Sequence, residues 1–144
     1  MDYDDPAVEE QWCSDRRSQV AAYLATEQVT HGQIGDWPAW HFAPYVSIWA
    51  IESHSELGWV GWWVICGDLP TDYVSASSIK HPRDAMLAFA HRWRSAAECL
   101  ALGQSPPGFS LGAPSDGVAL APLLAARAGL LQDFATDTEL WDEP

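Results

Sequence analysis

Lysine is almost missing from this sequence, since Lys80 is the single one in 144 residues. Asp and Glu number 20 against seven Lys and Arg, which gives a formal net charge of −13 at pH 7. Proteins that bind nucleic acid carry a basic stripe or patch facing the phosphates. The shortage of basic residues therefore argues against a nucleic-acid partner.

Long hydrophobic runs are missing as well. The longest one, Leu57–Cys66, is far shorter than the roughly 20 apolar residues that a membrane helix needs. The first residues are acidic and include no apolar segment of the kind found in signal peptides. These absences predict a cytoplasmic protein with no membrane partner.

Cysteine is scarce and poorly spaced for metal or disulfide chemistry. Cys13, Cys66 and Cys99 are odd in number, and no two have C-x-x-C or zinc-finger spacing. The motifs G-x-S-x-G, P-loop, G-x-G-x-x-G and H-E-x-x-H are missing too. Cys66 ends an apolar stretch, where burial raises a thiol pKa and makes the thiol inert. We expect free and mostly buried thiols, no metal and no cofactor.

Half of the acidic residues lie at the two ends of the chain. Residues 1–10 and 133–144 hold ten of the twenty, and neither segment has a Lys or Arg. Such blocks are usually solvated, and they can also steer a basic protein partner by long-range attraction. Because the length suits one domain, we expect a single domain over residues 1–144 with acidic flexible ends.

Three segments show the apolar spacing of a helix: residues 6–27, 82–102 and 118–135. Asp5 can cap the first helix, and Pro6 suits its first position. Pro82 begins the second helix and Gly103 ends it. The third is expected to bend or restart near Pro122. Its predicted apolar stripe consists of Leu120, Leu123, Leu124, Leu130, Leu131 and Phe134.

Two apolar segments, residues 45–52 and 59–66, flank a short polar turn and predict an antiparallel hairpin. Residues 73–76 add a third strand at most. Both faces of 59–66 are apolar, so both must be covered, either by long loops or by a second copy in a homodimer. Gly61 leaves room for a neighbouring ring such as Trp49.

The predicted fold class is therefore α+β. It has an N-terminal helix, a two- to three-stranded antiparallel sheet and two C-terminal helices. The connection over residues 103–117 is rich in Gly, Pro and Ser, which is typical of a surface loop. Phe109 and Leu111 are expected to anchor this loop.

A long loop expected over residues 28–44 holds five candidate site residues: His31, Asp36, Trp37, Trp40 and His41. Histidine and carboxylate side chains suit acid–base catalysis or metal binding. The spacing of the two histidines matches no known ligand set, so no metal is predicted. In the alternative interpretation the histidines bond nearby backbone while the Trp rings pack the loop down.

Asp68, Asp72 and Tyr73 follow the predicted hairpin. Paired carboxylates perform general acid–base catalysis when they lie close together. Sequence spacing does not give their separation, and Asp before Leu-Pro is also an ordinary turn former. A catalytic pair and a simple turn therefore both stay open.

Arg16 and Arg127 fall inside the apolar stripes of the first and last helices. An Arg in such a stripe is rarely buried alone, because an unpaired buried charge is very costly. The carboxylates expected to pair with them are those of Asp36, Glu52, Asp68 and Asp72. The two Arg residues are either structural, in ion pairs that fix a helix to a loop, or functional, as anion-binding groups in a pocket.

Several strings resemble a family of small bacterial proteins classed only as a domain of unknown function. They are "HGQIGDWPAWHFAPYVSIWAIES" (31–53), "GWVGWWVICGDLPTDYVSA" (58–76), "HPRDAMLAFAHRW" (81–93) and "LAPLLAARAGLLQDFA" (120–135). The resemblance covers nearly the whole chain and rests most on the Trp-rich strings. It implies a stand-alone bacterial domain and brings no activity with it.

Two functions remain open from the sequence. The first is a non-enzymatic binding or protein-interaction module, including one that docks a basic partner. The second is a small enzyme whose site lies where the 28–44 loop meets the 67–73 turn. In that enzyme Asp68, Asp72, His31 and His41 would be acid, base or ligands. The missing catalytic signatures favour the first function.

Overall fold

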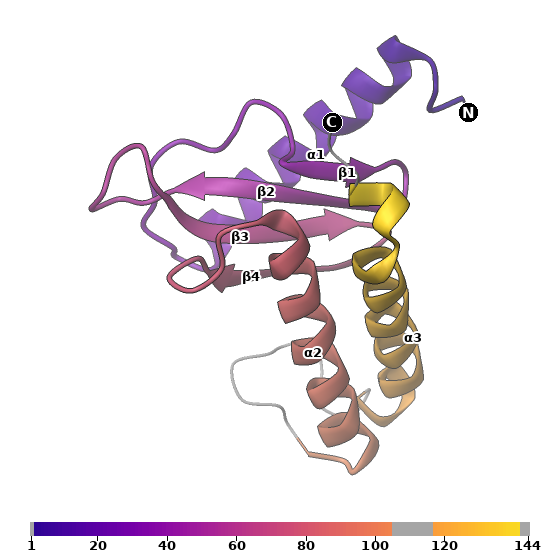
Figure 1. Cartoon of the computed structure of the whole chain (residues 1–144). Helices are drawn as coiled ribbons and strands as arrows, with labels where there is room; N and C mark the ends of the chain where they lie inside the picture. Colours follow the sequence, from indigo (N-terminus) through magenta and orange to yellow (C-terminus); the bar gives the residue numbers. More distant parts are fainter. Residues whose placement is uncertain (1, 105–116, 142–144) are drawn as a thin grey trace. The chain divides into compact units, whose positions relative to one another are not determined.

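The computed structural model describes residues 2–104 and 117–141 of the chain (Figure 1). Its elements are α1 (Pro6–Thr26), β1 (Trp40–Phe42), β2 (Val46–Glu52), β3 (Val60–Gly67), β4 (Leu69–Ser75), α2 (Pro82–Ala101), α3 (Gly117–Thr136) and the short η2 (Thr138–Trp141). The fold is α+β, as predicted. The expected anchors Phe109 and Leu111 lie outside the described residues. The chain divides into two compact units, and the division falls between Ala85 and Met86.

Helix α1 begins where its sequence signals predict. The Asp5 side chain accepts a hydrogen bond of 2.9 Å from the Ala7 amide, and Pro6 occupies the first helical position. The helix lies across one face of the sheet (Figure 1). There Val20 and Leu24 pack into a cluster with sheet residues, while the N-terminal half of the helix remains more exposed.

The sheet has four antiparallel strands in the order β1-β2-β3-β4. Two or three strands were expected. Strand β1 lies within the region predicted as a loop, because a three-residue strand is too short to show a period. Strand β4 begins at Leu69 rather than at residue 73. Pro70 favoured a turn in the sequence, but proline is tolerated in an edge strand such as β4.

Both faces of the central strands are buried, which confirms their two-sided apolar pattern. Trp49, Ile51, Val64 and Cys66 join α1 in one hydrophobic cluster. On the opposite face of the sheet Ile48 and Ile65 are also fully buried. The indole N–H of Trp49 donates to Ser47 Oγ at 2.9 Å, so this buried ring leaves no polar atom unpaired.

The start of β3 differs from the prediction. Trp59 exposes 69% of its surface and Val60 exposes 40%, so the buried part of the strand begins only after Gly61. The pairing of β2 with β3 shifts register there, which leaves Gly61 as an extra residue. A Cβ on Gly61 would lie 2.8 Å from Ser53 Cα. The glycine therefore accommodates backbone, and not the Trp49 ring.

In the second unit α3 returns alongside α2 (Figure 1), and Arg94 Nη1 donates to Gln132 Oε1 at 3.4 Å between them. The buried positions of α3 are Ala121, Leu124, Ala128, Leu131 and Ala135. Leu123 was expected in this stripe but is 65% exposed. The buried positions recur every three or four residues, and three of the five are alanine. The predicted stripe contained only Leu and Phe and therefore left these alanines out.

Pro122 lies inside α3, which runs unbroken from Gly117 to Thr136. The expected restart of the helix at this residue is therefore wrong. Residues 118–136 are also long and apolar enough to cross a membrane by length and composition. Core helices of soluble proteins meet the same criterion, so this property assigns no location.

Candidate functional site

Residues 32–35 run along the edge of β2 as an additional extended segment. The amide of Gly32 donates to the Glu52 carbonyl at 2.9 Å, and the Glu52 amide donates to Gln33 at the same distance. The Gly35 amide donates to the Ala50 carbonyl at 3.2 Å. These bonds hold the first part of the predicted loop against the last residues of β2.

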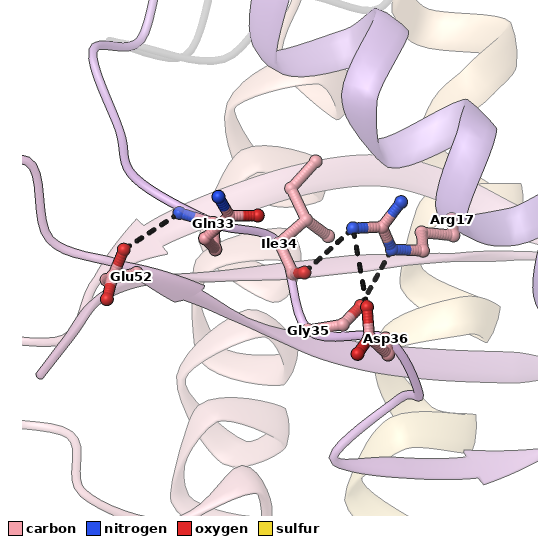
Figure 2. Close-up of polar contacts among 6 residues, drawn as sticks. All are labelled: Arg17, Gln33, Ile34, Gly35, Asp36 and Glu52. Carbon is pink, nitrogen blue, oxygen red and sulfur yellow. Dashed lines mark hydrogen bonds and ion pairs between the residues drawn. The ribbon is translucent and has the colours of Figure 1, made fainter. Parts of the chain in front are cut away.

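The guanidinium of Arg17 fastens the other side of this segment (Figure 2). Its Nε donates to the Gly35 carbonyl and its Nη2 to the Ile34 carbonyl, both at 2.9 Å. Nη2 also lies 3.9 Å from Oδ1 of Asp36. Arg17 thus satisfies two carbonyls at the edge of the sheet that would otherwise face water or another strand.

Glu52 joins the same segment to the turn between β2 and β3. Its Oε1 accepts from the Gln33 amide at 3.0 Å, and its Oε2 accepts from the Gly58 amide at 2.8 Å. These two backbone hydrogen bonds hold the pKa of the Glu52 carboxyl below its ordinary value. The carboxylate therefore stays charged and fixed at the end of β2.

A pocket of about 360 Å³ lies between these elements. Its lining consists of Gln33, Ile34, Gly35, Asp36, Ala50, Glu52, Gly58, Trp59 and Val60. Apolar side chains supply part of its wall, and two carboxylates stand at separate places along it. Figure 2 shows Glu52 and Asp36 at opposite ends of the Gln33–Gly35 stretch. We call this hollow the edge pocket.

The structure does not bring Asp68 and Asp72 together as a catalytic pair. Asp68 is exposed in the one-residue link between β3 and β4, where its amide donates to the Tyr45 carbonyl at 2.9 Å. Asp72 is buried within β4, and its Oδ1 accepts from the Tyr73 amide at 2.9 Å. Four residues of strand place their Cα atoms about 13 Å apart.

The two histidines are also separated. His31 precedes the segment that bonds Glu52, whereas His41 in β1 pairs with Ser47 at the other end of β2. Ser47 and Glu52 are five residues apart in β2, which corresponds to about 17 Å along the strand. His31 Nδ1 contacts the carbonyl of its neighbour Gly32 at 2.7 Å, so His31 bonds nearby backbone, as the second interpretation of the loop expected.

His41 makes a different and more specific set of contacts. Its Nε2 lies 3.1 Å from Oε2 of Glu9 in α1. Its ring stacks on Trp12 with centroids 6.3 Å apart, and it meets Trp37 edge-on at 5.3 Å. This cluster ties β1 to the first half of α1, and Glu9 was not among the predicted partners.

Among the remaining predicted site residues, Asp36 lines the edge pocket. Arg16 places its guanidinium 5.6 Å from the Trp12 ring centroid, and its Nε is buried without a hydrogen-bond partner in the described part of the chain. Trp40 in β1 pairs with Ile48 in β2, and the Tyr73 ring packs edge-on against Tyr23 and Trp62. Arg127 is half-buried in the second unit.

No metal site is found among residues 2–104 and 117–141, and two of the three thiols there, Cys13 and Cys66, are buried. These residues contain no group of His, Cys, Asp and Glu side chains arranged to hold a metal ion. Burial, together with the Glu9 carboxylate, raises the pKa of Cys13 to about 11. Burial likewise raises the pKa of Cys66, although a hydrogen bond with Ser47 partly opposes it. Both thiols are therefore protonated near neutral pH.

Thiol labelling at pH 8 is expected to distinguish the three cysteines. Cys99 is half-buried and should react first with a disulfide reagent. A pKa raised from 9.0 to about 11 leaves Cys13 about 100-fold less thiolate, so it should react far more slowly. The Cys99→Ser variant should lose the fast phase of the reaction. Loss of that phase in Cys13→Ser instead would contradict the assignment.

Sequence reasoning missed three residues that shape the edge pocket. Arg17 lies beside the apolar stripe of α1 and was not among the candidate site residues, and Trp59 was placed in a predicted strand with both faces covered. Glu52 was considered only as a partner for an Arg side chain. The one available signal was the polar Glu52 at the end of an apolar strand, followed by a turn and an aromatic residue.

Comparison with known proteins gives a family and no activity. No curated protein and no solved structure matches the chain significantly. A family model described as "Domain of unknown function (DUF4826)" matches residues 6–141, from the first residue of α1 to the end of η2. The chain therefore belongs to the DUF4826 family of domains of unknown function.

Proposed function

We propose that the protein is a non-enzymatic interaction module that docks a protein partner at the edge pocket. The observation that carries this proposal is the exposure of Leu57 and Trp59, at 74% and 69%, beside a formed hollow. Large apolar side chains gathered on a surface are typical of interaction sites. Trp is also among the residues that contribute most to binding energy at interfaces.

The edge pocket is held in shape before any partner arrives. Arg17 fixes one wall through two carbonyls, and Glu52 fixes another through the amides of Gln33 and Gly58. Binding to a preformed site loses little conformational entropy, which leaves more of the contact energy for affinity. A rigid hollow next to a projecting Trp is well suited to receive one side chain of a partner.

Charge favours a basic partner for this surface. Residues 1–85, which form the first unit, contain thirteen Asp and Glu against four Lys and Arg. Two of these acids, Asp36 and Glu52, line the edge pocket. A negative surface accelerates encounter with a positive partner and repels nucleic acid. The expected cytoplasmic location and the lack of a membrane partner are parts of the same proposal.

The enzyme hypothesis gains no support from the geometry. Its four residues, His31, His41, Asp68 and Asp72, occupy separate places on the sheet and its loops. General acid–base catalysis needs the two groups within reach of one substrate atom. Of these four, His41 contacts the Glu9 carboxylate of α1, which was not part of the hypothesis.

Site-specific photocrosslinking tests the proposed function. A photoreactive amino acid replaces Trp59, and a matched variant carries it at Glu27, which is exposed at the end of α1. Irradiation in the native host should yield a protein adduct from position 59 and none from position 27. Equal adducts at both positions, or none at either, would contradict a docking role. An adduct with a second copy of the chain would make the homodimer the occupant.

A thermal-shift screen against metals and metabolites provides the second arm of this test. An interaction module should show no large shift with any single small molecule. A rise of several degrees with one metabolite would instead identify a ligand-binding or catalytic site, because a ligand stabilises the state that it binds. That result would overturn the non-enzymatic assignment.

A further inference from the structure

We propose that the edge pocket receives an arginine side chain from the docked partner. This inference rests on the proposed docking function and names the chemistry that the pocket recognises. Three features carry it: two accessible carboxylates, an exposed indole ring and an apolar wall.

The two carboxylates differ in how firmly they are held. Glu52 accepts one backbone amide on each oxygen, which fixes the group and leaves a lone pair on each oxygen for a further donor. The Asp36 side chain is fully exposed, and its described partner is Arg17 at 3.9 Å. Both groups are thus charged and accessible at the two ends of the hollow.

Arg17, the cation paired with Asp36, also bonds to backbone. Arg17 directs its Nε and Nη2 to the Gly35 and Ile34 carbonyls at 2.9 Å, so its strongest bonds go to backbone oxygen. The distance of 3.9 Å to Asp36 is too long for a hydrogen bond. Two carboxylates beside one guanidinium leave a net negative charge at the pocket, which favours a cation from outside.

The apolar wall suits the stem of an arginine. Ile34, Ala50 and Val60 line the space between the carboxylates. A long basic side chain lays its methylene groups on such a surface and keeps its charged head at the polar rim. The volume of about 360 Å³ is near the lower end for ligand sites, which suits a side chain better than a larger cofactor.

Trp59 is the reason for preferring arginine over lysine. Its ring is mostly exposed at the rim, so its face is open to a flat group. A guanidinium stacks on an indole and can bond a carboxylate through two N–H groups, whereas an ammonium does neither equally well. A partner segment with an accessible arginine is therefore the occupant that this chemistry fits.

The test compares two small probes on the full chain by nuclear magnetic resonance. N-acetyl-arginine-methylamide is titrated, followed by the citrulline analogue, which has the same shape and no charge. The Trp59 indole N–H signal is assigned from its loss in Trp59→Phe. We expect a saturable shift with the arginine probe at millimolar concentration and at least tenfold weaker binding of the citrulline probe. Equal binding of the two probes, or no shift with either, would overturn the inference.

Two variants and one control sharpen the result. Glu52→Gln should weaken arginine binding about tenfold, and Asp36→Asn should weaken it about threefold without touching the turn. Glu56→Gln, a matched change at an exposed acid outside the pocket lining, should leave binding unchanged. Equal weakening of arginine binding by all three variants would show that only the overall negative charge of the protein matters. That result would reject the site. If position 59 still crosslinks to a partner while neither probe binds, the docking function stands and the arginine assignment falls.

Discussion

The Arg17→Met variant is expected to lose about 2–3 kcal/mol of unfolding free energy, whereas Arg16→Met should stay within about 1 kcal/mol of the wild type. Arg17 donates two hydrogen bonds of 2.9 Å to loop carbonyls. Bonds from a charged donor contribute about 1.5–3 kcal/mol each, and partial exposure of Arg17 reduces their sum. Methionine keeps the apolar stem but leaves both carbonyls without this donor.

Arg16 differs because its buried Nε has no hydrogen-bond partner in the described part of the chain. Removing it relieves an unsatisfied polar atom at the loss of a cation–π contact worth about 0.5–1 kcal/mol. Urea unfolding of both variants measures the difference. Hydrogen exchange at Gly32 and Gly35 reports whether the edge segment has loosened in Arg17→Met. A larger loss for Arg16→Met would contradict the roles given to the two residues.

The Gly67→Ala variant is expected to be destabilised by about 3 kcal/mol or more. Gly67 has a φ of +147°, a conformation that side chains other than glycine rarely adopt. A Cβ there would collide with the Tyr45 carbonyl oxygen and lie 2.9 Å from its carbon. Since both atoms belong to the backbone, the sheet must deform to make room.

Gly58→Ala is the matched control for this prediction. Gly58 also has a positive φ, of +88°, but a Cβ there meets nothing within 4 Å. The control should lose only the conformational part, about 1–2 kcal/mol. Thermal and urea unfolding of the two variants separate the collision from the backbone preference. Equal losses in both would show that Gly67 is required for its φ alone.

The helices were predicted well because their signals are local. Pro6 and Pro82 begin α1 and α2 where expected, and the ends of all three helices lie within one residue of the predicted bounds. A period of 3.6 residues and a proline at the first turn depend only on neighbouring positions. The two central strands were recognisable for the same reason, since β-branched and aromatic residues fill both of their faces.

The candidate site could not be predicted, because it depends on pairings between distant segments. Whether Arg16 or Arg17 reaches the edge segment depends on where Gly35 lies in the fold. The sequence around the two Arg residues does not indicate that position. Adjacent helical residues also point about 100° apart, so a small error in helix orientation exchanges their roles. The extra residue at Gly61 is equally invisible until β2 and β3 are paired, and it leaves Trp59 outside the core.

The separation of the candidate acid–base residues has a geometric reason. Asp68 directly precedes β4 and Asp72 lies within it, so the chain between them is extended. An extended strand has a larger rise per residue than a helix, which separates the two carboxylates. His31 and His41 were taken as neighbours in a loop, and an edge segment and β1 now separate them. On a helix, two residues four apart in sequence lie on the same face and close together. In an extended strand the same sequence spacing separates them.

We propose that the edge pocket, and not the acidic N-terminal segment, binds a basic partner. Mapping backbone amide shifts with a short arginine-rich peptide tests it most directly. We predict that the perturbed amides lie in residues 33–36 and 52–60, saturate together and lose most of their shift in Glu52→Gln. Shifts confined to residues 2–10, which hold Asp2, Asp4 and Asp5, and unaffected by Glu52→Gln would contradict the account.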